Sequence, residues 1–143
     1  MKKPSSIFLF LLIIFLVSCR TSSTSTEVKV LPSPEAGKAV IHGQVLSDPA
    51  DHLDNTTLRL AEVYRNEDGD GAFALDEATS PSTISDENGN FVFVNIEPGE
   101  YVLFIGSLHT DFVVNTNPDS SAVVYEVGPG ETLEIEPIIL NFE

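Results

Sequence analysis

The chain has 143 residues, of which 42% are hydrophobic, and 22 Asp and Glu against 7 Lys and Arg give it a formal net charge of −15. This excess of negative charge repels phosphate backbones and anionic lipid headgroups, which argues against nucleic acid as a partner and against lying flat on a bilayer. The acidic residues alternate with Val, Ile, Leu and Phe instead of forming one block, a composition typical of a folded domain.

Residues 1–18 predict a signal peptide. Two lysines open it, residues 7–17 form an unbroken apolar run, and a small residue precedes Cys19, the single cysteine. The run is too short for a membrane span, which needs about 20 apolar residues. Leu16-Val17-Ser18-Cys19 resembles the lipobox of bacterial lipoproteins, which implies cleavage before Cys19, thioether lipidation of its sulfur and acylation of the new amino terminus. An ordinary secretory signal that ends at a cysteine by coincidence is the alternative.

Removal of residues 1–18 would leave five Lys and Arg against twenty-two Asp and Glu, a formal charge of −17. Residues 19–37 are rich in Ser, Thr and Pro and predict a flexible tether, whose typical span of about 25 Å would hold the next domain clear of the headgroups. A lipid on Cys19 would attach the protein to the cell membrane or the outer membrane, facing the periplasm or the exterior. With its sulfur lipidated, the mature chain would have no free thiol.

Residues 38–143 predict one all-β domain, because short β-type runs alternate with Gly, Pro, Asn and Asp and no segment has a helical period. About seven strands at this spacing favour a Greek-key β-sandwich. The predicted strands are 39–46, 57–64, 82–85, 90–95, 100–105, 122–127 and 132–140, with a further short piece possible at 111–114. Turns are predicted at 86–90, where the chain should form a hairpin, at 97–100 and at 128–130.

Alternation along two runs predicts which side chains face the core. Leu58 and Leu60 share one face of a strand while Arg59 and Ala61 share the other, and the same pattern sets Phe91 and Phe93 against the valines between and after them. Strands with apolar residues on both faces are expected in the middle of a sandwich. The three tyrosines and nine phenylalanines are expected to fill the core.

Residues 85–103, S-D-E-N-G-N-F-V-F-V-N-I-E-P-G-E-Y-V-L, resemble the T-D-x-x-G-x-F-x-F-x-x-L-x-P-G-x-Y-x-L signature of carboxypeptidase regulatory-like domains. The first predicted strand, with its glycine at Gly43, and the closing 129–132 segment resemble the same family. This resemblance covers most of residues 38–142 and implies a transthyretin-like (prealbumin-like) sandwich. The departure from the family is an insertion between the second and third predicted strands.

That insertion contains a segment, residues 66–77, that fits the twelve-residue calcium loop of EF-hand and dockerin type. The predicted ligands are Asn66, Asp68, Asp70, the backbone carbonyl of Ala72, and Glu77 as the bidentate carboxylate. Gly71 would supply the sharp turn that lets one loop wrap a hard cation. Two features weaken the match: its first position is Asn instead of Asp, and a strand precedes it where an EF-hand has a helix. The alternative is a solvated Asp-Gly hairpin tip that binds no metal.

The sequence predicts no enzyme, since it contains no Ser-His-Asp arrangement, phosphate-binding glycine loop or zinc-hydrolase motif. It also lacks the C-terminal Tyr-Arg-Gly-Ser that marks hydroxyisourate hydrolases, which share the transthyretin-like fold. A binding or structural role with a protein partner in the cell envelope is the leading interpretation. Two alternatives remain. A carbohydrate-binding module predicts exposed aromatic residues, and an unrecognised hydrolase predicts carboxylates, with Asp48, Asp51 and Asp54 as candidates, converging in a cleft.

Overall fold

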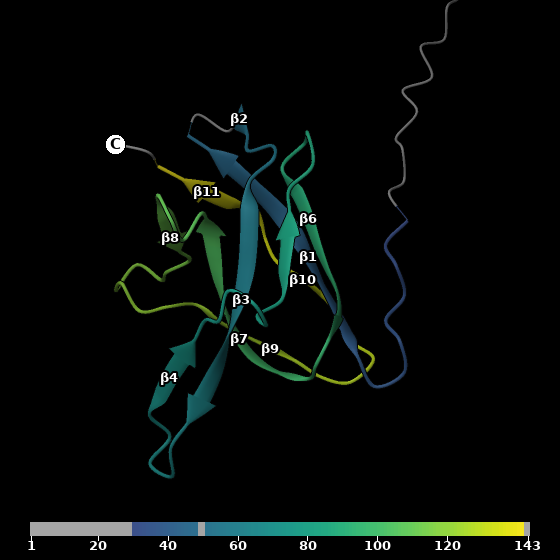
Figure 1. Cartoon of the computed structure of the whole chain (residues 1–143), viewed down its shortest axis with the longest axis vertical. Helices are drawn as coiled ribbons and strands as arrows, with labels where there is room; N and C mark the ends of the chain where they lie inside the picture. The colour runs from purple at the N-terminus through teal and green to yellow at the C-terminus, as the bar shows by residue number, and fades with distance from the viewer. Residues whose placement is uncertain (1–29, 49–50, 142–143) are drawn as a thin grey trace, which may run out of the picture.

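The computed structural model describes residues 30–48 and 51–141, and within these ranges it contains β-strands and no helix. The predicted signal peptide, Cys19 and the first part of the tether lie outside the described residues. No helix in the described ranges is long and apolar enough to cross a membrane. The strands are β1 Ala39–Ser47, β2 Asp51–His52, β3 Thr57–Arg65, β4 Gly71–Ala74, β5 Ser82–Ile84, β6 Asn90–Ile96, β7 Gly99–Gly106, β8 Phe112–Val114, β9 Val124–Val127, β10 Thr132–Glu134 and β11 Ile138–Leu140 (Figure 1).

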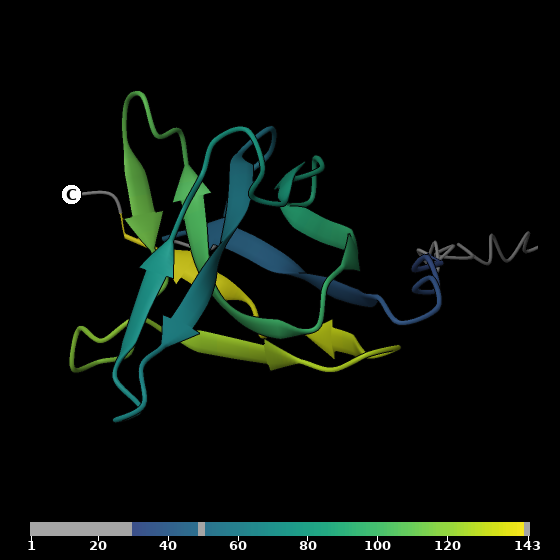
Figure 2. The ribbon, with the colours of Figure 1, turned by 60° about the horizontal axis from the view of Figure 1, so that its bottom comes forward.

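The strands form two sheets that pack face to face, which confirms the all-β sandwich (Figure 2). In the five-stranded sheet β1 is central. It pairs with β6 and β2 along one edge, and with β10 and β11, both parallel to it, along the other. In the six-stranded sheet β3 and β7 are central, with β5 and β4 along the outer edge of β3 and β9 and β8 along the outer edge of β7.

The eleven strands therefore occupy seven positions, three in one sheet and four in the other, because four edge positions are each shared by two short strands. All seven predicted strands are present, and the short piece predicted at 111–114 is formed as β8. The predicted last strand, 132–140, is divided into β10 and β11 at residues 135–137. The two strands that the sequence did not predict are β2 and β4.

The main core lies between the sheets. Leu58 and Leu60 of β3 and Phe91 and Phe93 of β6 point into it and are at most 2% exposed, as their alternation predicts. Gly43 of β1 pairs with Phe91 of β6. A Cβ on Gly43 would come within 2.8 Å of the Phe91 ring and within 2.9 Å of the backbone oxygen of Ile135, between β10 and β11. Glycine is therefore required where the ring crosses β1.

The connections at both ends of β6 carry the chain from one sheet to the other. In the predicted turn at 86–90, the Asp86 carboxylate accepts hydrogen bonds from the backbone of Asn88 and Asn90, and Gly89 has a φ of 74°. This turn is tight, as predicted, but it is not a hairpin, since β5 belongs to the six-stranded sheet and β6 to the five-stranded one. The turn before β7 returns the chain to the six-stranded sheet.

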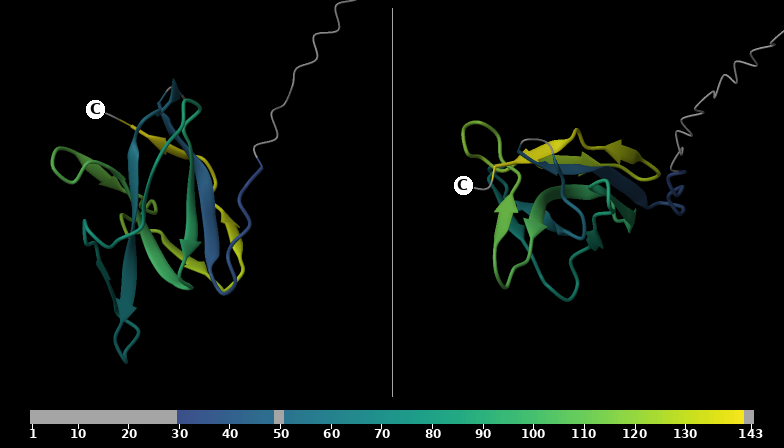
Figure 3. Two further views of the ribbon diagram at one scale, coloured as in Figure 1. Left: turned by 45° about the vertical axis from the view of Figure 1, so that its right-hand side comes forward. Right: turned by 90° about the horizontal axis from the view of Figure 1, so that it is seen from above.

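The last part of the predicted tether, residues 30–37, contains no strand and approaches β6. Glu35 and Asn95 exchange two hydrogen bonds, one from the Glu35 backbone N–H and one from the Asn95 side-chain amide. In all views this segment lies on the side of β1 and β6, away from β4 and β8 (Figures 1 and 3). Residues 30–37 therefore lie on the side of the sandwich opposite those two strands.

Candidate binding site

The outer face of the six-stranded sheet carries a second apolar cluster, outside the main core. A sheet face that is not packed against another layer is ordinarily polar, so this cluster is unexpected. Ala61, Val102 and Phe104 point outward from β3 and β7, yet none is more than 6% exposed. Partly buried side chains surround them: Val63, Leu75, Leu108, Val114 and Ala122. We call these eight residues, with Phe73, Phe112 and Val124 on the same side of the sheet, the aromatic face.

Three phenylalanine rings cross the aromatic face. The ring centroids of Phe73 and Phe104 are 5.6 Å apart at 69°, and those of Phe104 and Phe112 are 5.4 Å apart at 35°. The central ring is buried, whereas Phe73 is 47% exposed and Phe112 is 48% exposed. The expectation that all tyrosines and phenylalanines fill the core is therefore wrong for these two residues, and also for Tyr64, which is 56% exposed. Strands β4 and β8 place the two rings beyond the reach of the opposite sheet.

Two loops cover the middle of the aromatic face. Leu75 belongs to the β4–β5 connection and Leu108 to the β7–β8 connection, and both pack on the cluster around Phe104. The loops are joined by His109, whose Nε2 lies 2.8 Å from Oε1 of Glu77. Arg59 of β3 also donates to the backbone oxygen of Glu77, at 3.2 Å. These contacts hold the loops over the buried ring and leave the outer rings in contact with solvent.

A groove of about 260 Å³ lies beside the covered part of the face. Val63 and Val102 line it from the sheet, β4 provides one wall, and Ala122 and Val124 provide the other. Arg65 also lines the groove. Its volume is just below the range usual for small-molecule pockets, about 300 to 1,000 Å³, and is large enough for one protruding side chain.

Charged residues border the groove at one end. Nε of Arg65 lies 2.6 Å from Oε2 of Glu100, and hydrogen bonding to Glu100, aided by the nearby charges of Glu100 and Glu126, raises the pKa of Arg65. Glu100 and Glu126 are register partners on β7 and β9, so two carboxylates stand directly opposite each other. Like charges in this arrangement repel. The Arg65 guanidinium therefore forms an ion pair with Glu100 and is also near the charge of Glu126, at the end of an apolar groove.

Two wider hollows, of about 470 and 670 Å³, lie along the open side of the sandwich where the β8–β9 edge faces the β10–β11 edge. Asn115, Tyr125 and the 134–139 segment line the first, and Phe112, Val113 and Leu140 are among the residues that line the second. Both hollows follow unpaired strand edges, whereas the groove on the aromatic face has a floor of paired strands.

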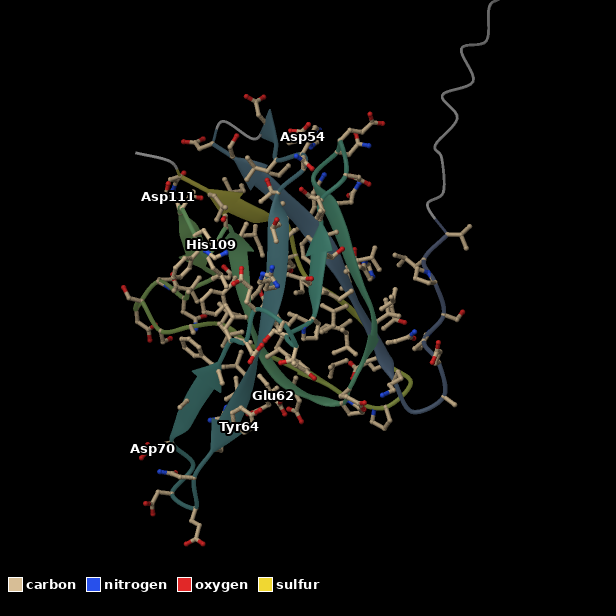
Figure 4. The ribbon with its side chains drawn as sticks, viewed as in Figure 1. Asp54, Glu62, Tyr64, Asp70, His109 and Asp111 are labelled. Carbon is tan, nitrogen blue, oxygen red and sulfur yellow. The ribbon has the colours of Figure 1, made fainter. Side chains whose placement is uncertain are left out.

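Three of the predicted calcium ligands lie together at the tip of the β3–β4 hairpin, which projects beyond the sheets (Figure 4). Oδ1 of Asn66 accepts hydrogen bonds from the backbone N–H groups of Asp68, at 3.1 Å, and Asp70, at 2.8 Å. Ala72, whose carbonyl was predicted as a ligand, follows within β4. The tip is an Asx turn that closes on itself through the side chain of Asn66.

Glu77, the predicted bidentate ligand, is not at this tip. It lies beyond β4, whose four residues span about 13 Å as an extended strand, and its carboxylate contacts His109. Figure 4 shows Asp70 at the protruding end of the hairpin, with His109 far from it beside β8. The predicted set therefore does not converge in this conformation. In residues 30–48 and 51–141 no three His, Cys, Asp or Glu side chains are grouped so as to hold a metal ion, and calcium binding stays a prediction.

The candidate hydrolase residues Asp48, Asp51 and Asp54 are all exposed; Asp51 begins β2, Asp48 comes before this strand and Asp54 follows it. The sequence signal for the aromatic face is the presence of apolar residues on both faces of β3 and β7. Val102 and Phe104 make the outward side of β7 apolar, and the alternation in β3 does the same through Ala61 and Val63. A strand that is apolar on both faces can be covered by its own loops as well as by a second sheet.

No protein-family model matches the chain, and no curated protein matches it, so the resemblance to carboxypeptidase regulatory-like domains stays a prediction. Solved β-sandwich structures are distantly similar. A candidate carbohydrate-binding protein from Pseudomonas aeruginosa is 15% identical, with a TM-score of 0.44 over 77% of this chain and 92% of that one. The dioxygenase domain of a dioxygenase carbohydrate-binding protein fusion from Streptomyces sp. SirexAA-E is 12% identical, with a TM-score of 0.44 over 80% and 86%. The major pilin subunit of Bacillus cereus is 17% identical, with a TM-score of 0.40 over 75% of this chain and 30% of that one. Likenesses this distant assign no function to the chain.

Proposed function

We propose that this protein is a lipid-anchored, extracytoplasmic binding module that binds a protein partner in the cell envelope through the aromatic face, without catalysis. The lipobox-like segment ending at Cys19 supports the anchor, and the 85–103 signature supports a Greek-key, transthyretin-like domain of the carboxypeptidase regulatory-like type. Residues 30–37, the described end of the predicted tether, lie on the side away from β4 and β8. The proposed anchor would therefore join the domain on the side away from the aromatic face.

The aromatic face is the observation that carries this proposal. Contiguous exposed apolar surface is unfavourable in water and marks interaction sites when polar residues surround it. Here two half-exposed rings flank a buried one, and a groove lies beside them. Protein interfaces commonly combine such an aromatic centre with a charged rim, which Arg65 and Glu100 provide.

Site-specific photo-crosslinking in the native cells tests the proposal. A photoreactive phenylalanine analogue at Phe112 should form a discrete protein adduct. The same analogue at Val94, which is 49% exposed on the outer face of the five-stranded sheet, should not form it. An equal adduct from both positions, or none from Phe112, would contradict the proposal.

A carbohydrate-binding module is the second candidate, favoured by the exposure of Phe73 and Phe112. Against it, the central ring Phe104 is only 6% exposed, so the two exposed rings are not joined into one continuous stacking platform. Retention of the protein on cell-wall polysaccharide, lost in Phe112→Ala and kept in Val94→Ala, would favour this candidate over a protein partner.

Ordering of residues 66–77 by calcium is a separate part of the proposal, supported by the spacing of Asn66, Asp68, Asp70 and Glu77. Because Glu77 contacts His109 and lies beyond β4, its recruitment to the tip would require it to leave His109 and the end of β4 to separate from β3. Calcium titration by calorimetry, with a chelator as the reference, measures whether this rearrangement occurs.

A further inference from the structure

We infer that the partner of the aromatic face is a basic protein surface, one that inserts an apolar side chain into the groove and places Lys or Arg beside Glu100 and Glu126. This inference rests on the proposed function and specifies its partner. It follows from the shape of the groove, from the charges at its end, and from the charge of the whole chain.

The groove admits a single side chain. Its floor is Val63 and Val102, which belong to paired central strands, and its volume of about 260 Å³ is closed on both sides by Phe73 and by Val124. An apolar side chain that enters it removes its own surface and that of its walls from water, which is the main favourable contribution at interface centres.

The excess of negative charge at the end of the groove favours a cation from the partner. On the same outer side of the sheet, Glu100 comes two residues before Val102 along β7, and Glu126 comes two residues after Val124 along β9. These carboxylates repel each other across the strands, and Arg65 forms its ion pair with Glu100. A partner's Lys or Arg beside Glu126 would relieve this repulsion and increase the rate of encounter.

A second copy of this chain does not fit that description. Each mature copy would carry the same pair of glutamates and a formal charge of −17, so two aromatic faces would repel each other. In the described residues the cations are Lys38, Arg59 and Arg65, and each already contacts Glu97, Glu77 or Glu100. Among the described residues a second copy therefore offers no Lys or Arg without such a contact, and the complementary charge is assigned to a different molecule.

Synthetic peptides test the inference on the full chain in mild detergent, with a fluorescent label, anisotropy as the readout and detergent alone as the blank. The first peptide has one phenylalanine flanked by lysines. The second has alanine in place of the phenylalanine, and the third has glutamates in place of the lysines. The first should bind most tightly, and added salt should weaken it because exposed charge pairs are screened.

Matched variants locate the binding. Val124→Lys fills the groove and neutralises the glutamate pair, so it should weaken the first peptide at least tenfold, whereas Val94→Lys, on the other sheet, should leave it unchanged. Glu126→Gln should weaken it by about two- to fivefold, the range expected for one exposed charge pair. Glu134→Gln, an exposed glutamate of β10, is its control.

Equal binding of the lysine and glutamate peptides, or equal loss in Val124→Lys and Val94→Lys, would overturn the inference. The inference would also be overturned if cell-wall polysaccharide displaced the first peptide from wild type and no longer retained the Val124→Lys variant. If no peptide binds but the crosslink from Phe112 forms, the basic partner is wrong and the proposed function stands. If the crosslink also fails, both are wrong.

Discussion

Replacing Phe104 by alanine should destabilise the protein by an amount within the range of core mutations, although the side chain points away from the main core. Truncation of a buried phenylalanine costs about 3 to 5 kcal/mol in the free energy of unfolding. Phe104 is 6% exposed, but loops and half-exposed rings cover its outer side instead of a second sheet. The lower end of the range, about 3 kcal/mol, is therefore expected. For a domain of this size it corresponds to a melting temperature lower by roughly 12 °C.

Urea unfolding followed by far-ultraviolet circular dichroism measures this loss, with the slope m as a check that the unfolded state is unchanged. Phe112→Ala is the matched control: it removes the same atoms from the same face, but its ring is 48% exposed, so about 1 kcal/mol is expected. A loss below about 1 kcal/mol for Phe104→Ala, or equal losses in the two variants, would show that the loops do not bury the outward side of β7.

Three further predictions concern turns, pH and calcium. Gly89→Ala should lower the free energy of unfolding by well over the roughly 1 to 2 kcal/mol usual for a left-handed residue, because its Cβ would lie 2.2 Å from the Val45 carbonyl oxygen. Gly130→Ala is the control: Gly130 has a similar φ but open space around it, so the loss should be only that usual amount. Equal losses in urea unfolding would refute the clash. Hydrogen bonds from two backbone N–H groups lower the pKa of Asp76 in the folded state, so the stabilising effect of this carboxylate is present above its usual pKa and is lost as the pH falls through the lowered value. The melting temperature of Asp76→Asn should therefore fall less than that of wild type between neutral pH and about pH 3. Parallel curves of melting temperature against pH would refute this. Calcium should raise the melting temperature of wild type relative to chelator and leave that of Glu77→Gln unchanged; equal responses would remove Glu77 from the site.

The strands that the sequence predicts are those whose own residues favour extension. β1, β3, β6 and β7 combine β-branched and aromatic residues with alternation, and their ends were placed within about one residue. β4 was missed because Gly71–Ala74 has one residue of high β propensity, and it is a strand only because it pairs with the end of β3. The break between β10 and β11 is a change of register against β1: His42 pairs with Glu134 but Val45 pairs with Ile138, so the last strand has one extra residue over this stretch, and no local pattern specifies such a long-range shift.

The site was less predictable than the fold, for a related reason. Residue type shows that β7 is apolar on both faces, but not which layer covers each face. The β4–β5 and β7–β8 connections cover the outward face, and they meet through Glu77 and His109, residues 32 positions apart in the sequence. The calcium motif shows the converse. Its spacing is correct in sequence, yet the strand between Asp70 and Glu77 is extended by pairing with β3, which a motif match does not consider.

The central place of β1 constrains the order in which the protein can fold. The other four strands of its sheet all pair with β1, and the two parallel ones come from the last residues of the described chain, so that Val40 pairs with Thr132. Pairings so distant in sequence form slowly, because a long loop must close before any contact is gained. In a chain that emerges amino end first from a ribosome or a translocon, one edge of β1 can pair with β6 earlier, but the other edge stays unpaired until residues 132–140 have emerged. The last pairing to form is therefore at the edge of the first strand of the sandwich, and a chaperone that shields β1 in the interval would protect the whole domain from aggregation.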